Sequence, residues 1–240
     1  MKKKSNNKQR GLGLVELMVG ITIGLIVAAA ASMVMVMQVK EHRRLVLNTQ
    51  IQQDLRAASG LMLSDTRRSG FWATPQMAVW APGQGVSSNP YQVQSGCSVS
   101  SDGQHLLVYA YSGADYATTG TKPNPQLDKV QSAEYFGLRR SGNALQFMYG
   151  CGSDGGANWQ PLTDPSTVSI KKFDVNTVQQ TVNLAAYCSK ACTEPNCPHL
   201  VVRRYDIILA GEAAHDPRVK RELHISSRPR SDAIQGACPA

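Results

Sequence analysis

The first long pattern in the chain is an apolar run that carries no formal charge from Leu17 to Val39. Twenty-three uncharged residues at a helical rise of about 1.5 Å each give about 35 Å, enough for a hydrocarbon core of about 30 Å. The pattern therefore predicts a membrane-spanning helix over residues 12–39. A cleaved secretory signal is the alternative, with "AAAAS" at residues 28–32 as its cleavage site, but apolar residues continue well beyond that point.

The next pattern is amphipathic. Apolar side chains recur at spacings of three and four, which is typical of a helix with one buried face. They are Leu47, Ile51, Leu55, Ala58 and either Leu61 or Met62. We expect this continuation over residues 40–70, with the helix running from Leu12 to about Arg68 and Gly70 ending it.

Beyond residue 70 the pattern changes to short strands between loops. Residues 75–104 and 112–132 are rich in Gly, Pro, Ser, Asn and Gln, which indicates loops. Strands are expected at residues 105–111, 167–175, 200–209 and 218–226, and the clearest hairpin lies at 134–150 around Ser141-Gly142-Asn143. The chain is therefore predicted to be α+β: a long N-terminal helix packed against an antiparallel sheet that forms a globular head over residues 71–240.

The distribution of charge predicts which end of the helix faces the cytoplasm. The net charge is +8, but five basic residues lie in residues 1–11, and removing that segment leaves 20 basic against 17 acidic residues, or +3. The basic residues before the span outnumber Lys40, Arg43 and Arg44 after it. This favours a cytoplasmic N-terminus and a periplasmic or extracellular head.

Six cysteines lie beyond the span, at positions 97, 151, 188, 192, 197 and 238. An even count on the far side of a membrane predicts up to three disulfides, although six cysteines allow fifteen pairings. Proximity favours Cys97 with Cys151, and the others could include a local bridge and one to Cys238. Zinc held by Cys188, Cys192, Cys197 and His199 is the alternative, but their spacings fit zinc sites poorly.

The segment "RGLGLVEL" resembles the processing signal of type IV prepilins, a short basic leader that ends in glycine before an apolar helix. The resemblance implies that residues 1–11 are a leader, that prepilin peptidase cleaves between Gly11 and Leu12, and that the Leu12 amine is N-methylated. It also implies that Glu16 registers subunits by meeting the amine of a neighbour. At 4 Å and an effective dielectric of 20 that attraction is about 4 kcal/mol before desolvation. The alternative is that Glu16 reaches the lipid headgroups.

Small residues recur every four positions on the same helix, at Gly20, Gly24, Ala28 and Ser32. Such a stripe lets another helix approach closely, as in a filament core. A second, shorter resemblance follows the helix: "LSDTRRSGFW" is similar to a passage of PilW-like minor pilins, carried here by Asp65, Arg67, Gly70 and Phe71. Residues 151–175 are similar to their segment of Trp, Pro-Leu and strand.

The sequence gives little support for catalysis, for a calcium site or for DNA binding. The five histidines are scattered, and Ser153 lacks the glycine spacing of a nucleophile elbow. Asp154 suits a plain turn better than a calcium site. Trp72, Trp80 and Trp159 are expected to pack in the core or loops. A basic C-terminal region suggests DNA contact, but neighbouring acidic residues dilute its field; its members are Arg203, Arg204, Arg218, Lys220, Arg221, Arg228 and Arg230.

The sequence thus predicts a minor type IV pilin with no catalytic residues, metal or cofactor. It is expected to take part in priming and assembly of the pilus, and thereby in twitching motility, adhesion and DNA uptake. Expected partners are other minor and major pilins, prepilin peptidase, the inner-membrane assembly platform and, before assembly, the membrane itself; direct nucleic-acid binding is not expected. The alternatives are a type II secretion pseudopilin and a membrane-anchored periplasmic enzyme.

Overall fold

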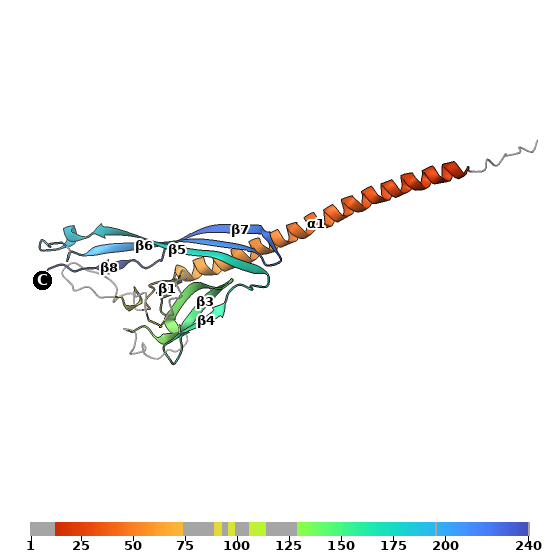
Figure 1. Ribbon diagram of the computed structural model, residues 1–240. Coiled ribbons are helices and arrows are strands. Elements are labelled where there is room, and N and C mark those ends of the chain that lie inside the picture. The colour runs from red at the N-terminus through yellow and green to blue at the C-terminus, as the bar shows by residue number, and fades with distance from the viewer. Residues whose placement is uncertain are drawn as a thin grey trace, which may run out of the picture. The chain divides into compact units, whose positions relative to one another are not determined.

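The computed structural model describes residues 13–73, 89–92, 96–98, 106–113, 129–194 and 196–239. It divides into two compact units, Met1–Leu47 and Asn48–Ala240, so each is described by itself. One helix, α1 (Leu14–Thr66), contributes to both units. The described residues of the second unit add eight strands and three short 3-10 helices, which makes the fold α+β as predicted (Figure 1).

The strands form two antiparallel sheets, where the sequence had predicted one. The first sheet has the order β1-β2-β3-β4, from β1 (Leu106–Ala110), β2 (Tyr135–Ser141), β3 (Ala144–Cys151) and β4 (Ala157–Pro161). The second has the order β5-β6-β7, from β5 (Val168–Asn183), β6 (His199–Ala213) and β7 (Asp216–Ser227), and β8 (Ala233–Gln235) also pairs with β6. The 3-10 helices are η2 (Pro90–Gln92), η3 (Ser132–Glu134) and η4 (Ala185–Tyr187).

Each expected strand is present where the structure describes the chain. The predicted hairpin closes through Gly142 and Asn143, with Ser141 paired to Ala144. Gly142 adopts a φ of +57°, a conformation that other residues rarely take. Most of the expected loops lie outside the described residues, as does Trp80.

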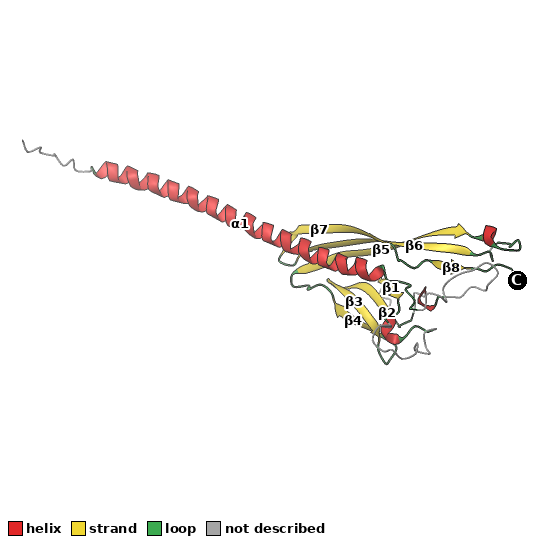
Figure 2. Ribbon diagram, turned by 180° about the vertical axis from the view of Figure 1, so that it is seen from behind, coloured by secondary structure: helices red, strands yellow, loops and turns green. Residues whose placement is uncertain are grey.

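The C-terminal part of α1 lies between the two sheets in both views (Figures 1 and 2). Its buried side chains follow the predicted spacing and include Ile51, Leu55, Ala58 and Met62, whereas Leu61 is 43% exposed. Of the two alternatives at this position, Met62 therefore faces the core. On the sheets, alternate residues complete the core, because successive side chains of a strand point to opposite faces; among them are Tyr205, Ile207 and Leu209 of β6.

Polar contacts fix the end of α1 to both sheets. The buried carboxylate of Asp65 accepts hydrogen bonds from the hydroxyls of Tyr109 and Tyr111 at the end of the first sheet. One residue further, the Thr66 hydroxyl lies 2.7 Å from that of Ser227 on β7. Burial, followed by the nearby Asp65 charge, raises the pKa of Tyr109 well above its ordinary value. The tyrosine therefore stays protonated and remains a donor to the carboxylate.

Backbone contacts also join the residues that follow Asp65 to neighbouring segments. Gly70 takes a φ of +76° just after the helix, as expected for a residue that ends one, and its N–H donates to the Ala110 carbonyl at 2.9 Å. The Arg67 carbonyl accepts from Arg230 N–H at 3.0 Å, and the Phe71 carbonyl accepts from Ser112 N–H at 2.9 Å. These residues thus join the helix end to its neighbours through backbone groups, in addition to Asp65.

A second buried carboxylate, Glu134 of η3, organises the loops beside the first sheet. It accepts hydrogen bonds from the Tyr91 hydroxyl at 2.7 Å and from the Gln131 and Gly113 N–H groups at 2.9 and 3.0 Å. Burial and the Glu134 carboxylate together raise the pKa of Tyr91 to about 12. Trp72 is buried in the adjoining cluster with Tyr91, as expected of a core residue.

Three disulfides tie the described loops and termini of the head. Cys97 bonds to Cys151, the pair that proximity favoured, and Cys192–Cys197 is a local bridge. Cys188 bonds to Cys238, 50 residues away, which joins the loop between β5 and β6 to the C-terminal segment. All six thiols are consumed, so the three cysteines considered for zinc are held in disulfides here.

Replacing Asp65 with Asn tests the link between the helix and the first sheet. We expect Asp65→Asn to lower the free energy of unfolding by about 1–3 kcal/mol, because two buried tyrosine hydroxyls lose a charged acceptor. Denaturant unfolding of the full chain in detergent, followed by tryptophan fluorescence, measures the change. Asp54→Asn on the same helix is the matched control, with an expected effect below about 0.5 kcal/mol. Equal effects of the two substitutions would contradict this role for Asp65.

The disulfides differ in the length of chain that they close, and their removal should differ accordingly. Cys188→Ser with Cys238→Ser should lower the free energy of unfolding by about 4 kcal/mol, since a loop of 50 residues is opened. Cys192→Ser with Cys197→Ser opens a loop of 5 residues and should lower it by about 2 kcal/mol. The same unfolding measurement compares the two variants, and a larger loss from the local bridge would contradict the entropic account.

Candidate functional site

The first unit consists of the N-terminal part of α1, and its surface is the candidate site. The large apolar side chains from Leu14 to Val39 are each between 50% and 77% exposed. In the described residues, α1 is the one helix that is long and apolar enough to cross a membrane, and none of its most apolar stretch is buried within the chain. Exposing a continuous apolar surface of this length to water is unfavourable, so lipid or other helices must cover it.

Glu16 lies in the first turn of α1. Its N–H donates to the Gly13 carbonyl at 3.0 Å, and the Leu17 N–H donates to the same oxygen at 3.2 Å. A carboxylate at this position is favoured by the positive end of the helix dipole. It is also the single formal charge on α1 before Lys40. Gly11 and Leu12 lie outside the described residues.

The four small residues lie on one side of the helix. A Cβ added to Gly20 or Gly24 would meet nothing within 4 Å, so the stripe presents open surface to a neighbour. The Ser32 hydroxyl donates to the Ala28 carbonyl and the Thr22 hydroxyl to the Val19 carbonyl, each at 2.8 Å. These internal bonds satisfy both hydroxyls, so neither requires water. The stripe can therefore face lipid or a second helix.

The other sequence candidates in the head take part in local structure. Asp154 accepts a hydrogen bond from Gly156 N–H at 3.0 Å, which makes a turn. His199 lies with Nδ1 2.7 Å from the Cys197 carbonyl and Nε2 3.3 Å from Glu194. The Arg139 guanidinium stacks over the Trp159 ring, 4.2 Å from its centroid. Among the described residues, no group of three or more His, Cys, Asp or Glu is placed to hold a metal ion.

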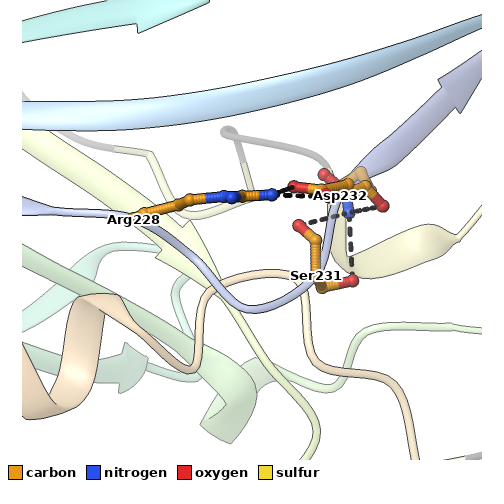
Figure 3. A network of polar contacts seen from close by, with 4 residues as sticks. Arg228, Ser231 and Asp232 are labelled. Atoms are coloured by element: carbon orange, nitrogen blue, oxygen red, sulfur yellow. Dashed lines mark hydrogen bonds and ion pairs between the residues drawn. The ribbon is translucent and has the colours of Figure 1, made fainter.

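The basic C-terminal residues do not form one patch of free charge. Arg204 pairs with Asp206, Arg218 with Asp216, and Lys220 lies 3.7 Å from Glu212. Figure 3 shows Arg228 directed at Asp232, with a nitrogen to oxygen distance of 3.0 Å, beside Ser231. Arg203 donates instead to the Gln92 side-chain oxygen at 3.1 Å, and Arg221 to that of Asn48 at 2.9 Å. This pairing weakens the field that a nucleic acid would require.

Sequence reasoning missed the edge of β5. Residues 167–175 were expected to be a strand, but β5 continues to Asn183, paired with β6 along its whole length. The alternation of Thr and Val at positions 177, 178, 181 and 182 was the available signal, since β-branched residues favour strands. It was weakened by the intervening glutamines and asparagines, which are more typical of loops.

Comparison with protein families gave two matches, and comparison with curated proteins and with solved structures gave none. Residues 6–32 match the prokaryotic N-terminal methylation motif. This range holds Gly11, Leu12, Glu16 and most of the apolar span.

The second match is to prepilin peptidase-dependent protein B and covers residues 44–229. It runs from the amphipathic part of α1 through both sheets to the end of β7, which is well over half of the 240 residues. With the methylation motif before it, the chain has the organisation of a type IV pilin-like protein. The chain therefore belongs to the prepilin peptidase-dependent protein B family.

Proposed function

We propose that this chain is a minor, PilW-like subunit of a type IV pilus that acts by association and not by catalysis. The observation that carries the proposal is the exposed apolar half of α1 with Glu16 as its single early charge, under a matched methylation motif. Such a helix needs an apolar environment before the subunit is assembled and a second one after it has entered the filament. The inner membrane supplies the first, and a bundle of like helices supplies the second.

Processing and assembly of the chain are proposed to take place in three stages. Prepilin peptidase removes residues 1–11 and the Leu12 amine is methylated, with the head in the periplasm. The assembly platform then moves α1 from lipid into a bundle of pilin helices. There the Glu16 carboxylate receives the N-terminal amine of a neighbouring subunit, and the stripe of Gly20, Gly24, Ala28 and Ser32 admits a close helix. Assembly with other minor and major pilins would support twitching motility, adhesion and DNA uptake.

The same N-terminal motif also occurs in type II secretion pseudopilins. Deleting the gene distinguishes a pilus subunit from a pseudopilin. We expect the deletion to reduce surface pili and twitching while leaving export of secreted proteins unchanged. Loss of export with normal pili would assign the chain to secretion instead. The match to the prepilin peptidase-dependent protein B family supports a role in association over the alternative of an anchored periplasmic enzyme.

Processing is the most direct test of the proposal. Mass spectrometry of the N-terminus should find a chain that begins at methylated Leu12 in cells with active prepilin peptidase. In cells without the peptidase the same measurement should find the basic leader still attached. A leader retained in the presence of the active enzyme would overturn the proposed function.

The role of Glu16 is tested by its replacement with Ala. Without the carboxylate, the neighbouring amine loses its partner, and we expect the amount of chain in sheared surface filaments to fall at least about tenfold, equivalent to about 1.4 kcal/mol. The unfolding transition of the head should not change, because Glu16 belongs to the other compact unit.

Glu41→Ala, at the next acidic residue of α1, is the matched control and should assemble normally. If Glu16→Ala assembles as well as Glu41→Ala does, the carboxylate has no part in registration.

A further inference from the structure

The outer edge of β5 differs from the other sheet edges of the described head. The last eight residues of the strand, Asn176–Asn183, are named here the distal edge. They pair with β6 on one side, and no other described strand pairs with them on the other side. The stretch spans about 26 Å at 3.3 Å per residue. Its outward backbone N–H and C=O groups therefore form a long row that a further strand can bond.

Exposed edges usually carry features that block such pairing, including charges, proline and short length. At the opposite side of the same sheet, β7 contains Pro217 and a series of charged residues from Arg218 to Glu222. The strands β1 and β4 at the borders of the other sheet have five residues each, and β8 has three. The distal edge has no charge and no proline in its eight residues. Among the described edges it is thus the one that is neither short nor interrupted by proline or charge.

The distal edge is also held in a fixed shape. At its end, Leu184 N–H donates to the Pro198 carbonyl at 2.8 Å, and the Asn183 amide donates to Glu194 at 2.6 Å. The loop that follows carries the Cys192–Cys197 bridge and is joined to the C-terminal segment by Cys188–Cys238. A partner strand would therefore meet a preformed edge and lose little affinity to the ordering of β5.

The strand registers place this edge beyond the end of α1. Gly211 of β6 lies against Leu55 and is paired with Ile170 at the start of β5. Thr66, the last residue of α1, contacts Ser227, which is in register with Tyr205 and, through it, with Thr177. The end of α1 and β5 thus run in the same direction, and the residues after Thr177 extend past the helix (Figure 1).

The shared direction of α1 and β5 limits which partner can pair with the distal edge. Antiparallel pairing is the more stable arrangement, but two copies joined antiparallel through β5 would point the C-terminal parts of their α1 helices in opposite directions. Subunits that co-assemble in one filament share one direction, so a second copy does not fit this edge. A different subunit can offer a strand that runs opposite to β5 while its own helix keeps the common direction. The residues of the edge themselves offer no opposite charge to a charged partner strand, which favours an uncharged one.

We propose that the distal edge, Asn176–Asn183, pairs antiparallel with an uncharged extended strand from a different pilin-type subunit, and so extends the second sheet across a subunit boundary. The proposal rests on the proposed function in one respect, that the partner is a co-assembled subunit. Backbone hydrogen bonds supply the attachment, and the Thr and Val side chains, which lie on opposite faces of the strand, select the partner strand.

A photo-crosslinker in the full chain tests the pairing in cells with active prepilin peptidase. p-Benzoylphenylalanine is placed at Val182, which is 51% exposed, and in a separate chain at Thr181, whose side chain lies on the opposite face of the sheet. Both positions should give an adduct with another chain that carries an N-terminal methylation motif. Mass spectrometry should map the adduct to an uncharged extended segment of that chain.

Two matched substitutions then test the edge. Gln180→Lys puts a charge in the middle of the distal edge and should lower the adduct yield at least tenfold. Gln160→Lys makes the same exchange at an exposed position of β4 and should leave the yield unchanged. The N-terminus is measured in the same samples, so a methylated Leu12 shows that processing is intact whatever the yield. An adduct with a second copy, the absence of an adduct, or equal yields in the two variants would overturn the pairing.

Discussion

The structure depends on one constraint, which is that the apolar surface of α1 must leave water along its whole length. The second half of the helix meets this constraint within the chain, since Ile51, Leu55, Ala58 and Met62 are buried against the two sheets. The first half does not, because its large apolar side chains stay at least half exposed. At about 25 cal/mol for each Å² of apolar surface, covering such a length of helix is a large driving force. The first half of α1 therefore requires a membrane or partner helices to cover it.

The head is organised to hold the end of this helix. Asp65 and Thr66, in its last turn, bond to the first and the second sheet respectively. Because the two contacts are adjacent in sequence, one turn of helix joins both layers. Arg67, Gly70 and Phe71 lie at the same junction, where a left-handed glycine and two backbone carbonyls bond to other segments.

Local patterns predicted the local elements. The helix, its buried face, the hairpin at Gly142 and the disulfide between Cys97 and Cys151 all follow from spacing or proximity along the chain. The division into two sheets does not, because the partner of each strand depends on contacts between distant residues. A bridge to Cys238 was expected, but its partner Cys188 could not be chosen for the same reason. The Glu134 cluster was not predicted, since Glu134 meets Tyr91 from 43 positions away. The roles proposed for Gly11, Leu12 and Glu16 rest on the motif, and the partners proposed for them lie in other molecules.

The two hydroxyls of the apolar span carry a consequence for how the helix changes surroundings. Between Leu17 and Met37 the polar side chains are those of Thr22 and Ser32, and both are bonded to carbonyls of their own helix. No side-chain hydrogen bond on this stretch has to break when acyl chains are exchanged for protein. The surroundings of the span can therefore change from lipid to protein without leaving a polar side chain between Leu17 and Met37 unbonded.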